Sequence, residues 1–123
     1  MDSSPIFAKT YDLLSWLIPL AHRFPKAQRF ILAQKIQDAG FALQESLVRA
    51  AKTDGTLAAL READVSLDLL RLRGRLAADL AFVSLRQYEH FCGRVDEIGR
   101  LLGGWMRRAR GEAAESQGAG IAP

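Results

Sequence analysis

The last third of the chain carries the feature that most restricts its fold, an apolar seam with helical spacing. Its six residues alternate at intervals of three and four positions: Tyr88, Phe91, Val95, Ile98, Leu102 and Trp105. This spacing keeps one face of an α-helix apolar over about five turns. Ser84, with Gln87 three residues later, fits a capping box that marks the start of this helix. Such a helix has to bury its apolar face against other helices.

Three earlier segments show the same period and predict helices over residues 6–22, 26–51 and 56–79. Short connections between four such helices favour an all-α fold, an antiparallel up-down four-helix bundle, over residues 1–110. Residues 111–123 are rich in Gly, Ala, Ser and Glu and lack an apolar period, so we expect a disordered tail there. The predicted core stripes are Phe7, Tyr11, Leu14, Ile18 and Ala21 in the first helix, Leu32, Ile36, Ala39, Leu43 and Leu47 in the second, and Leu60, Ala63, Leu67, Leu70, Gly74 and Ala77 in the third.

Some apolar residues fall outside these stripes. Phe30, Ile31 and Phe41 lie off the seam of the second helix, and Leu101 and Met106 lie off the seam of the fourth. Either the stripes are simply broad, as is common in small bundles, or an oligomer buries the extra residues. The pattern leaves both interpretations open.

Cysteine and hydropathy patterns bear on the compartment. The 123 residues contain one cysteine, which cannot form an internal disulfide, so a reducing compartment is the simpler interpretation. The longest nearly uncharged apolar stretch, Leu13 to Ala21, is too short to span a bilayer. We therefore expect a cytoplasmic protein with no membrane partner.

The chain offers little catalytic chemistry. His22 and His90 lie on different predicted helices, and neither has Cys or His partners at metal-ligand spacing. Cys92 is more typical of a small packing residue than of a nucleophile. No Gly-rich phosphate loop follows a strand. We expect no enzyme, no catalytic residue, no metal and no cofactor.

The charged residues are segregated along the chain, although the net charge is only +3. Residues 22–37 contain four basic residues and no acid, and residues 100–110 contain four arginines and no acid. Acidic residues dominate positions 54–68. Cations in a last helical turn are explained by the helix dipole, but Lys26 and Arg29 fall near a predicted helix start, where cations are disfavoured. That placement favours contact with phosphate.

A second charged stripe has two interpretations. Asp64, Asp68, Arg71 and Arg75 share one face of the third helix. They could form a ladder of ion pairs, Asp68 with Arg71 and Arg75 with Asp79, each contributing a few tenths of a kcal/mol. The two arginines could equally face a polyanion.

Three sequence blocks resemble a known family. They are YDLLSWLIP at Tyr11 to Pro19, FPKAQRF at Phe24 to Phe30, and GRLLGGW at Gly99 to Trp105. Together they resemble the accessory variability determinant (Avd) proteins of diversity-generating retroelements, within a wider four-helix family related to proteins encoded in ribosomal RNA intervening sequences. Leu70, Arg71 and Arg75 are similar to the L-R-x-x-x-R pattern of these proteins, whereas Gly74 departs from the bulky residue expected there.

The resemblance implies a non-enzymatic bundle that assembles as a pentamer with basic surfaces. It also implies binding to a reverse transcriptase and to its template RNA during mutagenic cDNA synthesis. We therefore predict contacts with RNA or another nucleic acid by Lys26, Arg29, Lys35, Arg71, Arg75, Arg100, Arg107 and Arg108. The alternative is a protein-interaction bundle with no nucleic-acid role, in which the basic residues serve solubility and the helix ends.

Overall fold

Four long helical stretches make up a computed structural model that describes residues 4–54 and 56–121, without the side chains of 28–30 and 116–121. The first stretch is α1, Pro5–Ala21. The second is built from α2, Lys26–Gln28, a π-helical segment η1, Arg29–Ala33, and α3, Gln34–Lys52. The third is α4, Thr56–Asp79, and the fourth is α5, Leu85–Ile121.

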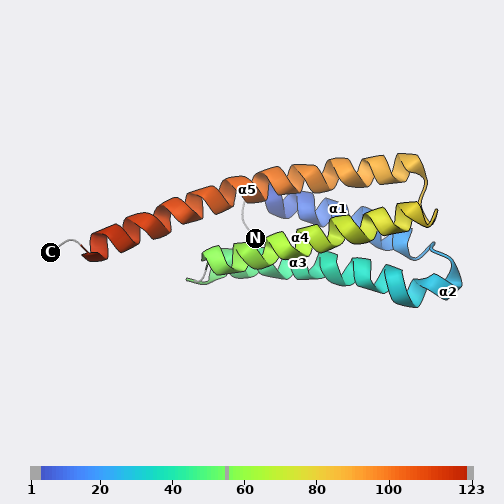
Figure 1. Cartoon of the computed structure of the whole chain (residues 1–123), viewed down its shortest axis with the longest axis horizontal. Coiled ribbons are helices and arrows are strands. Elements are labelled where there is room, and N and C mark those ends of the chain that lie inside the picture. The colour runs from blue at the N-terminus through green and yellow to red at the C-terminus, as the bar shows by residue number, and fades with distance from the viewer. Residues whose placement is uncertain (1–3, 55, 122–123) are drawn as a thin grey trace.

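The helices run up and down in sequence order (Figure 1). The helix α3 packs against α1 and α4, and α5 packs against the same two helices, so α1 and α4 lie diagonally opposite. The turns at residues 22–25 and 80–84 lie at one end of the bundle, and the end of α3 and the start of α4 lie at the other (Figure 1). The all-α four-helix fold is confirmed, with no strand in the described ranges.

The start of α5 confirms the predicted capping box. The Ser84 amide donates to Gln87 Oε1 at 2.8 Å, and the Gln87 amide donates to Ser84 Oγ at 3.1 Å. These two bonds satisfy amides that the first helical turn leaves without backbone partners. They fix where the chain enters its longest helix.

Three of the four predicted core stripes are confirmed. Every predicted stripe residue of α4 is buried, as are those of the second helical stretch, and in α5 the seam is buried except at its two ends. The stripe predicted for α1 is wrong in part, because Tyr11 is exposed. Two overlapping apolar stripes run along this helix, and the one that enters the core comprises Ile6, Thr10, Leu13, Leu14, Leu17 and Ala21.

The second predicted helix is not uniform, because η1 interrupts it. A π-helical turn accommodates one extra residue without breaking the helix. Leu32 and Ala33, at the end of η1, are both buried together with Ile36 of α3. The π-helical turn therefore ends on residues that belong to the core, and the ordinary helical period resumes from there in α3.

Two glycines allow helices to approach closely. A Cβ added to Gly40 of α3 would lie 2.6 Å from Leu14 Cδ2 of α1. A Cβ added to Gly74 of α4 would collide with the ring of Phe91 on α5. The missing bulk at Gly74 is therefore filled by an aromatic ring of the neighbouring helix.

The end of the chain differs from the disordered tail predicted from Gly111. The helix α5 continues to Ile121 and projects beyond the other helices (Figure 1). Residues 112–115, with the sequence EAAE, are strong helix formers without proline, so a helix already nucleated on the bundle extends through them. The lack of an apolar period indicates that this segment buries no face in the core. It does not indicate that the segment is non-helical.

We predict that Gly74→Ala lowers the free energy of unfolding by about 1–3 kcal/mol, because the new methyl group overpacks against Phe91. Gly93 provides the matched control, since a Cβ there meets nothing within 4 Å. Gly93→Ala should raise stability by up to about 1 kcal/mol through helix propensity alone. Urea denaturation followed by circular dichroism compares the two, and equal effects would contradict the predicted collision.

Candidate nucleic-acid interface

The fold separates the predicted basic residues into two surfaces. The first, here called the basic end, comprises Arg23, Lys26, Lys35, Arg75 and Arg86. All five are exposed and lie near the turns at 22–25 and 80–84. The second, here called the α5 strip, comprises Arg100, Arg107 and Arg108, toward the opposite end of the bundle.

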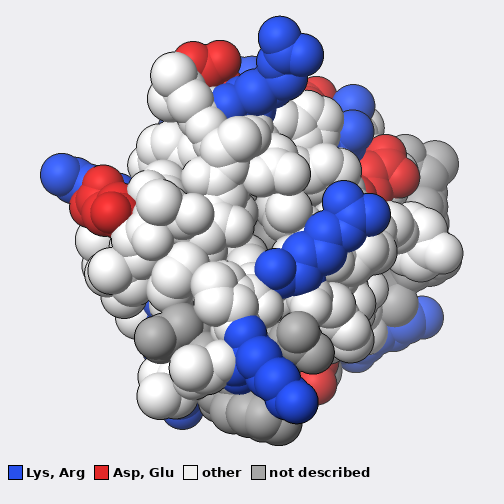
Figure 2. Space-filling view, turned by 90° about the vertical axis from the view of Figure 1, so that its right-hand side faces the viewer, with Lys and Arg blue, Asp and Glu red and all other residues white. Residues whose placement is uncertain are grey.

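The basic end is visible in Figure 2, which looks at the right-hand side of Figure 1. Lys and Arg side chains stand there among uncharged surface, and most Asp and Glu side chains lie toward the margin (Figure 2). Lys26 begins α2 and Lys35 lies in the first turn of α3. The side chain of Arg29, also predicted to bind nucleic acid, lies outside the described residues. This end therefore gathers cations from α2, α3, α4 and α5 around two turns.

The α5 strip is organised by glycine. Arg100 and Arg108 flank Gly104 at intervals of four residues, so all three share one face of the helix. With Trp105 and the first residues of α1, they line a pocket of about 160 Å³. A Cβ added to Gly104 would lie 3.4 Å from Arg108 Nη1, and one added to Gly103 would lie 3.5 Å from Arg107 Nη1. The guanidinium groups therefore extend back over bare backbone.

Arg71 lies between these surfaces and bridges two helices. Its Nη1 is 3.4 Å from Asp68 Oδ1 on α4, and its Nη2 is 3.5 Å from Asp96 Oδ1 on α5. Gly99 makes room for it, because a Cβ there would lie 2.6 Å from Arg71 Nη2. Gly99, the first residue of the block GRLLGGW, therefore accommodates Arg71, the first arginine of the L-R-x-x-x-R pattern.

The predicted ion-pair ladder on α4 is confirmed. Besides the Asp68–Arg71 pair, Arg75 Nε lies 3.9 Å from Asp79 Oδ2. Asp68, Arg75 and Asp79 are well exposed and Arg71 is half-buried, so each pair has an exposed partner and contributes little to stability. The pairing does not remove the arginines from solvent, and both remain accessible to a phosphate.

Two residues of the basic end, Arg23 and Arg86, were not among the predicted nucleic-acid contacts. Arg23 and Arg86 are exposed there, and Arg73 donates from Nη1 to the Lys35 carbonyl oxygen at 2.8 Å. Arg86 is isolated in sequence, so only its place in the first turn of α5, beside the turn at 80–84, could have indicated this grouping.

The titratable residues set aside on sequence grounds have structural contacts. His90 Nε2 accepts a hydrogen bond from Arg94 Nε at 2.8 Å, and its ring lies 4.7 Å from that of Trp16. A side-chain hydrogen bond with Cys92, aided by burial, raises the pKa of Tyr88 above its usual value of 10.0. Within residues 4–54 and 56–121, no three His, Cys, Asp or Glu side chains group as metal ligands would.

Hydropathy sets one further limit. None of the described helices combines the length and the apolar character needed to cross a membrane.

These features define a helical bundle with two basic surfaces, one at an end of the bundle and one along its longest helix. A family model described as bAvd-like matches residues 6–109, which include all three of the sequence blocks noted above. The chain therefore belongs to the bAvd-like family, and the resemblance to Avd proteins is confirmed. No curated protein matches the chain.

We predict that Arg71→Gln lowers the free energy of unfolding by less than about 1 kcal/mol, because both of its ion pairs are exposed. Arg86→Gln is the matched control, since Arg86 makes no ion pair with the described side chains and its loss should change stability by less than about 0.5 kcal/mol. Urea denaturation measures both variants. A loss above about 2 kcal/mol for Arg71→Gln would assign it a mainly structural role.

Proposed function

We propose that this protein is a non-enzymatic accessory scaffold that binds RNA and a reverse transcriptase in the cytoplasm during retroelement mutagenic cDNA synthesis. Membership of the bAvd-like family supports the proposal. The observation that carries it in this chain is the α5 strip. Arg100, Arg107 and Arg108 are exposed and make no ion pair with any described side chain, whereas Arg71 and Arg75 on α4 are paired.

The chemistry of the α5 strip suits phosphate. Arginine presents a planar fork of donors that matches phosphate oxygens and keeps its charge at any physiological pH. A strip of such groups along a helix neutralises several phosphates and releases their counterions, which gives salt-dependent binding with little sequence preference. The basic end would supply a second set of phosphate contacts, including Lys26, Lys35 and Arg75. Arg29, whose side chain lies outside the described residues, stays a predicted contact from its place in the sequence.

The proposed mechanism is scaffolding rather than catalysis. A protein that holds both template and polymerase turns their encounter into an intramolecular event with a raised effective concentration. Assembly of several copies, for which the family resemblance implies a pentamer, would multiply both basic surfaces. Each phosphate contact could be weak in a chain of net charge +3 and still give firm binding in the assembly.

We predict that the double variant Arg107→Gln/Arg108→Gln weakens RNA binding and reduces its salt dependence. Removing two phosphate contacts should decrease the slope of log affinity against log salt by about 1–2. Fluorescence anisotropy with a labelled template RNA, measured across a salt series, gives this slope. Arg61→Gln is the control, because Arg61 is exposed within an acidic stretch of α4, and it should leave the slope unchanged.

Two results would reject the proposal. One is the absence of RNA binding by the wild-type protein at low salt together with failure to retain the retroelement's reverse transcriptase in a pull-down. The other is a loss of slope in the Arg61 variant that is half of the loss in the Arg107/Arg108 variant, because equal losses per charge removed would show only a response to net charge.

The second candidate function is a protein-interaction bundle with no nucleic-acid role. Exposed apolar side chains on α4, with Val65 at 60 % and Leu72 at 64 % exposure, favour it. A partner retained after nuclease treatment and at high salt, from a protein that binds no RNA, would establish this alternative.

A further inference from the structure

The pocket of about 160 Å³ beside the α5 strip joins arginine to apolar and aromatic surface. Its lining residues are Ser4, Pro5, Ile6, Arg100, Leu101, Gly104, Trp105 and Arg108. The two arginines are exposed, and Leu101 and Trp105 are half-buried. Cations therefore stand at the mouth of a small cavity with largely apolar walls. We call it the α5 pocket.

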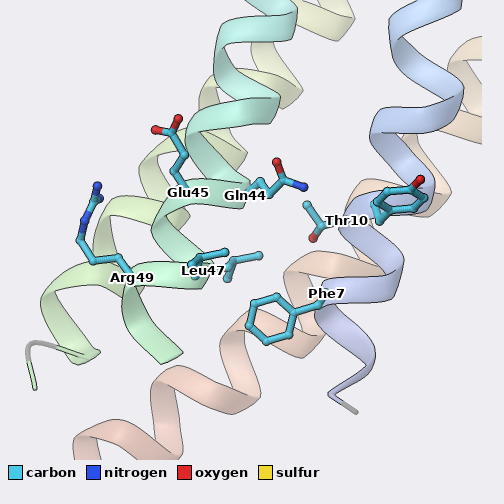
Figure 3. A pocket seen from close by; sticks show the side chains of 8 residues that line it. Phe7, Thr10, Gln44, Glu45, Leu47 and Arg49 are labelled. Atoms are coloured by element: carbon cyan, nitrogen blue, oxygen red, sulfur yellow. The ribbon is translucent and has the colours of Figure 1, made fainter. Parts of the chain in front are cut away.

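Two further cavities contain arginine, and in both a carboxylate accompanies it. The groove between α1 and α3, of about 650 Å³, holds Glu45 one turn before Arg49 on α3 (Figure 3). A cleft of about 250 Å³ between α4 and α5 holds Arg71 and Arg75, and Asp96 lies there too, 3.5 Å from Arg71. None of the residues that line the α5 pocket is acidic, and its arginines make no ion pair in the described part of the chain. The α5 pocket is therefore a better site for an anion than either of the other two.

Trp105 gives the α5 pocket an aromatic wall that is held in position. Its ring packs edge-on against Phe7 of α1, with ring centroids 6.1 Å apart and the two planes at 65°. Because the indole is half-buried and not enclosed, part of it remains accessible from the pocket. Aromatic side chains of this kind pack against nucleobases whatever the base, and a ring already fixed by its neighbour loses little freedom on binding.

The order of these groups along α5 matches the order within a nucleotide strand. Each base of RNA lies between two phosphates, and along α5 Gly104 and Trp105 lie between Arg100 and Arg108. The two arginines are eight residues apart, so their Cα atoms are separated by about 12 Å along the helix axis. The folding of Arg108 back over Gly104 shortens the span between the two charges. A base against Trp105 would therefore have an arginine available for the phosphate on each side.

We propose that the α5 pocket takes one unpaired nucleotide of RNA, with its base packed against Trp105 and its flanking phosphates bound by Arg100 and Arg108. A base reaches such a pocket only when it is unstacked, and extruding one from a duplex costs free energy. Phosphate contacts alone would favour the duplex, because its charge density is higher. The inference rests on the RNA binding of the proposed function and adds to it that the RNA is bound as a single strand.

Fluorescence anisotropy with a labelled oligouridine, alone or paired with oligoadenosine of the same length, tests this preference. The unpaired strand should bind more tightly than the duplex. Trp105→Leu should weaken binding of the unpaired strand by about 5-fold to 100-fold, because a base contact is lost. The same variant should bind the duplex as the wild type does and should keep the wild-type salt slope, since no phosphate contact is removed. Trp105→Phe, which keeps an aromatic ring, should retain most of the affinity.

Trp16→Leu is the matched control. Trp16 is the other tryptophan of the chain, is also half-buried, and packs against His90 outside the pocket. Its replacement should leave both affinities unchanged, and circular dichroism verifies the fold of each variant. A second measurement leaves the pocket intact. In a Trp16→Phe protein Trp105 is the sole tryptophan, and its fluorescence should be quenched by the single strand and not by the duplex.

The outcomes separate this inference from the proposed function. Equal affinity for the two RNAs, or an equal loss on both in Trp105→Leu, would overturn the nucleotide pocket and leave RNA binding itself intact. A loss in Trp16→Leu as large as that in Trp105→Leu would also overturn it, because the effect would then come from packing. Absence of binding to either RNA at low salt would overturn the proposed RNA binding together with the pocket.

Discussion

The rest of the bundle depends on the packing of α3 against α4, its most extensive helix–helix contact. The sides that meet carry small residues. Ser66 and Ala59 precede Arg73 by seven and fourteen positions, so they share the face from which Arg73 reaches the Lys35 carbonyl of α3. Both are buried, as are Ala39, Ser46 and Ala50 of α3. Small side chains let the two axes approach, and the larger residues then fill the space toward α1 and α5.

This close pairing determines what the other faces can do. One side of α4 is used by α3 and the adjacent side by α5, where Gly74 admits Phe91 and Arg71 crosses Gly99. The face diagonal to α1 has no helix left to cover it within the protomer. Val65 and Leu72 on that face are 60 % and 64 % exposed, so they bury little apolar surface within a single chain. Gly99 has an effect on Arg71 similar to that of Gly74 on Phe91. Because this glycine has no side chain, the Arg71 side chain can cross from α4 to α5 and remain partly exposed to solvent.

Sequence patterns predicted the helices well because each of them buries a stripe with the helical period, and Ser84 with Gln87 marked a start that the structure confirms. They failed where two patterns overlap. In α1, Tyr11 and Thr10 lie on neighbouring stripes, and only packing against α3 decides that the threonine is buried. The candidate site was predicted residue by residue, but its division into two surfaces was not. That division follows from which turns share an end of the bundle, and it placed Arg86 with Lys26 although sixty positions separate them.

The two basic surfaces lie at different places along the bundle. The basic end surrounds the turns at one end of the bundle, and the α5 strip runs toward the projecting part of α5. The salt dependence of phosphate binding grows with the number of contacts made at once. If several copies assembled, as the proposed function includes, both surfaces would be multiplied and many weak phosphate contacts would act together. The modest net charge of one copy would then be no argument against a polyanionic partner, because the field around an assembly would grow with the number of copies.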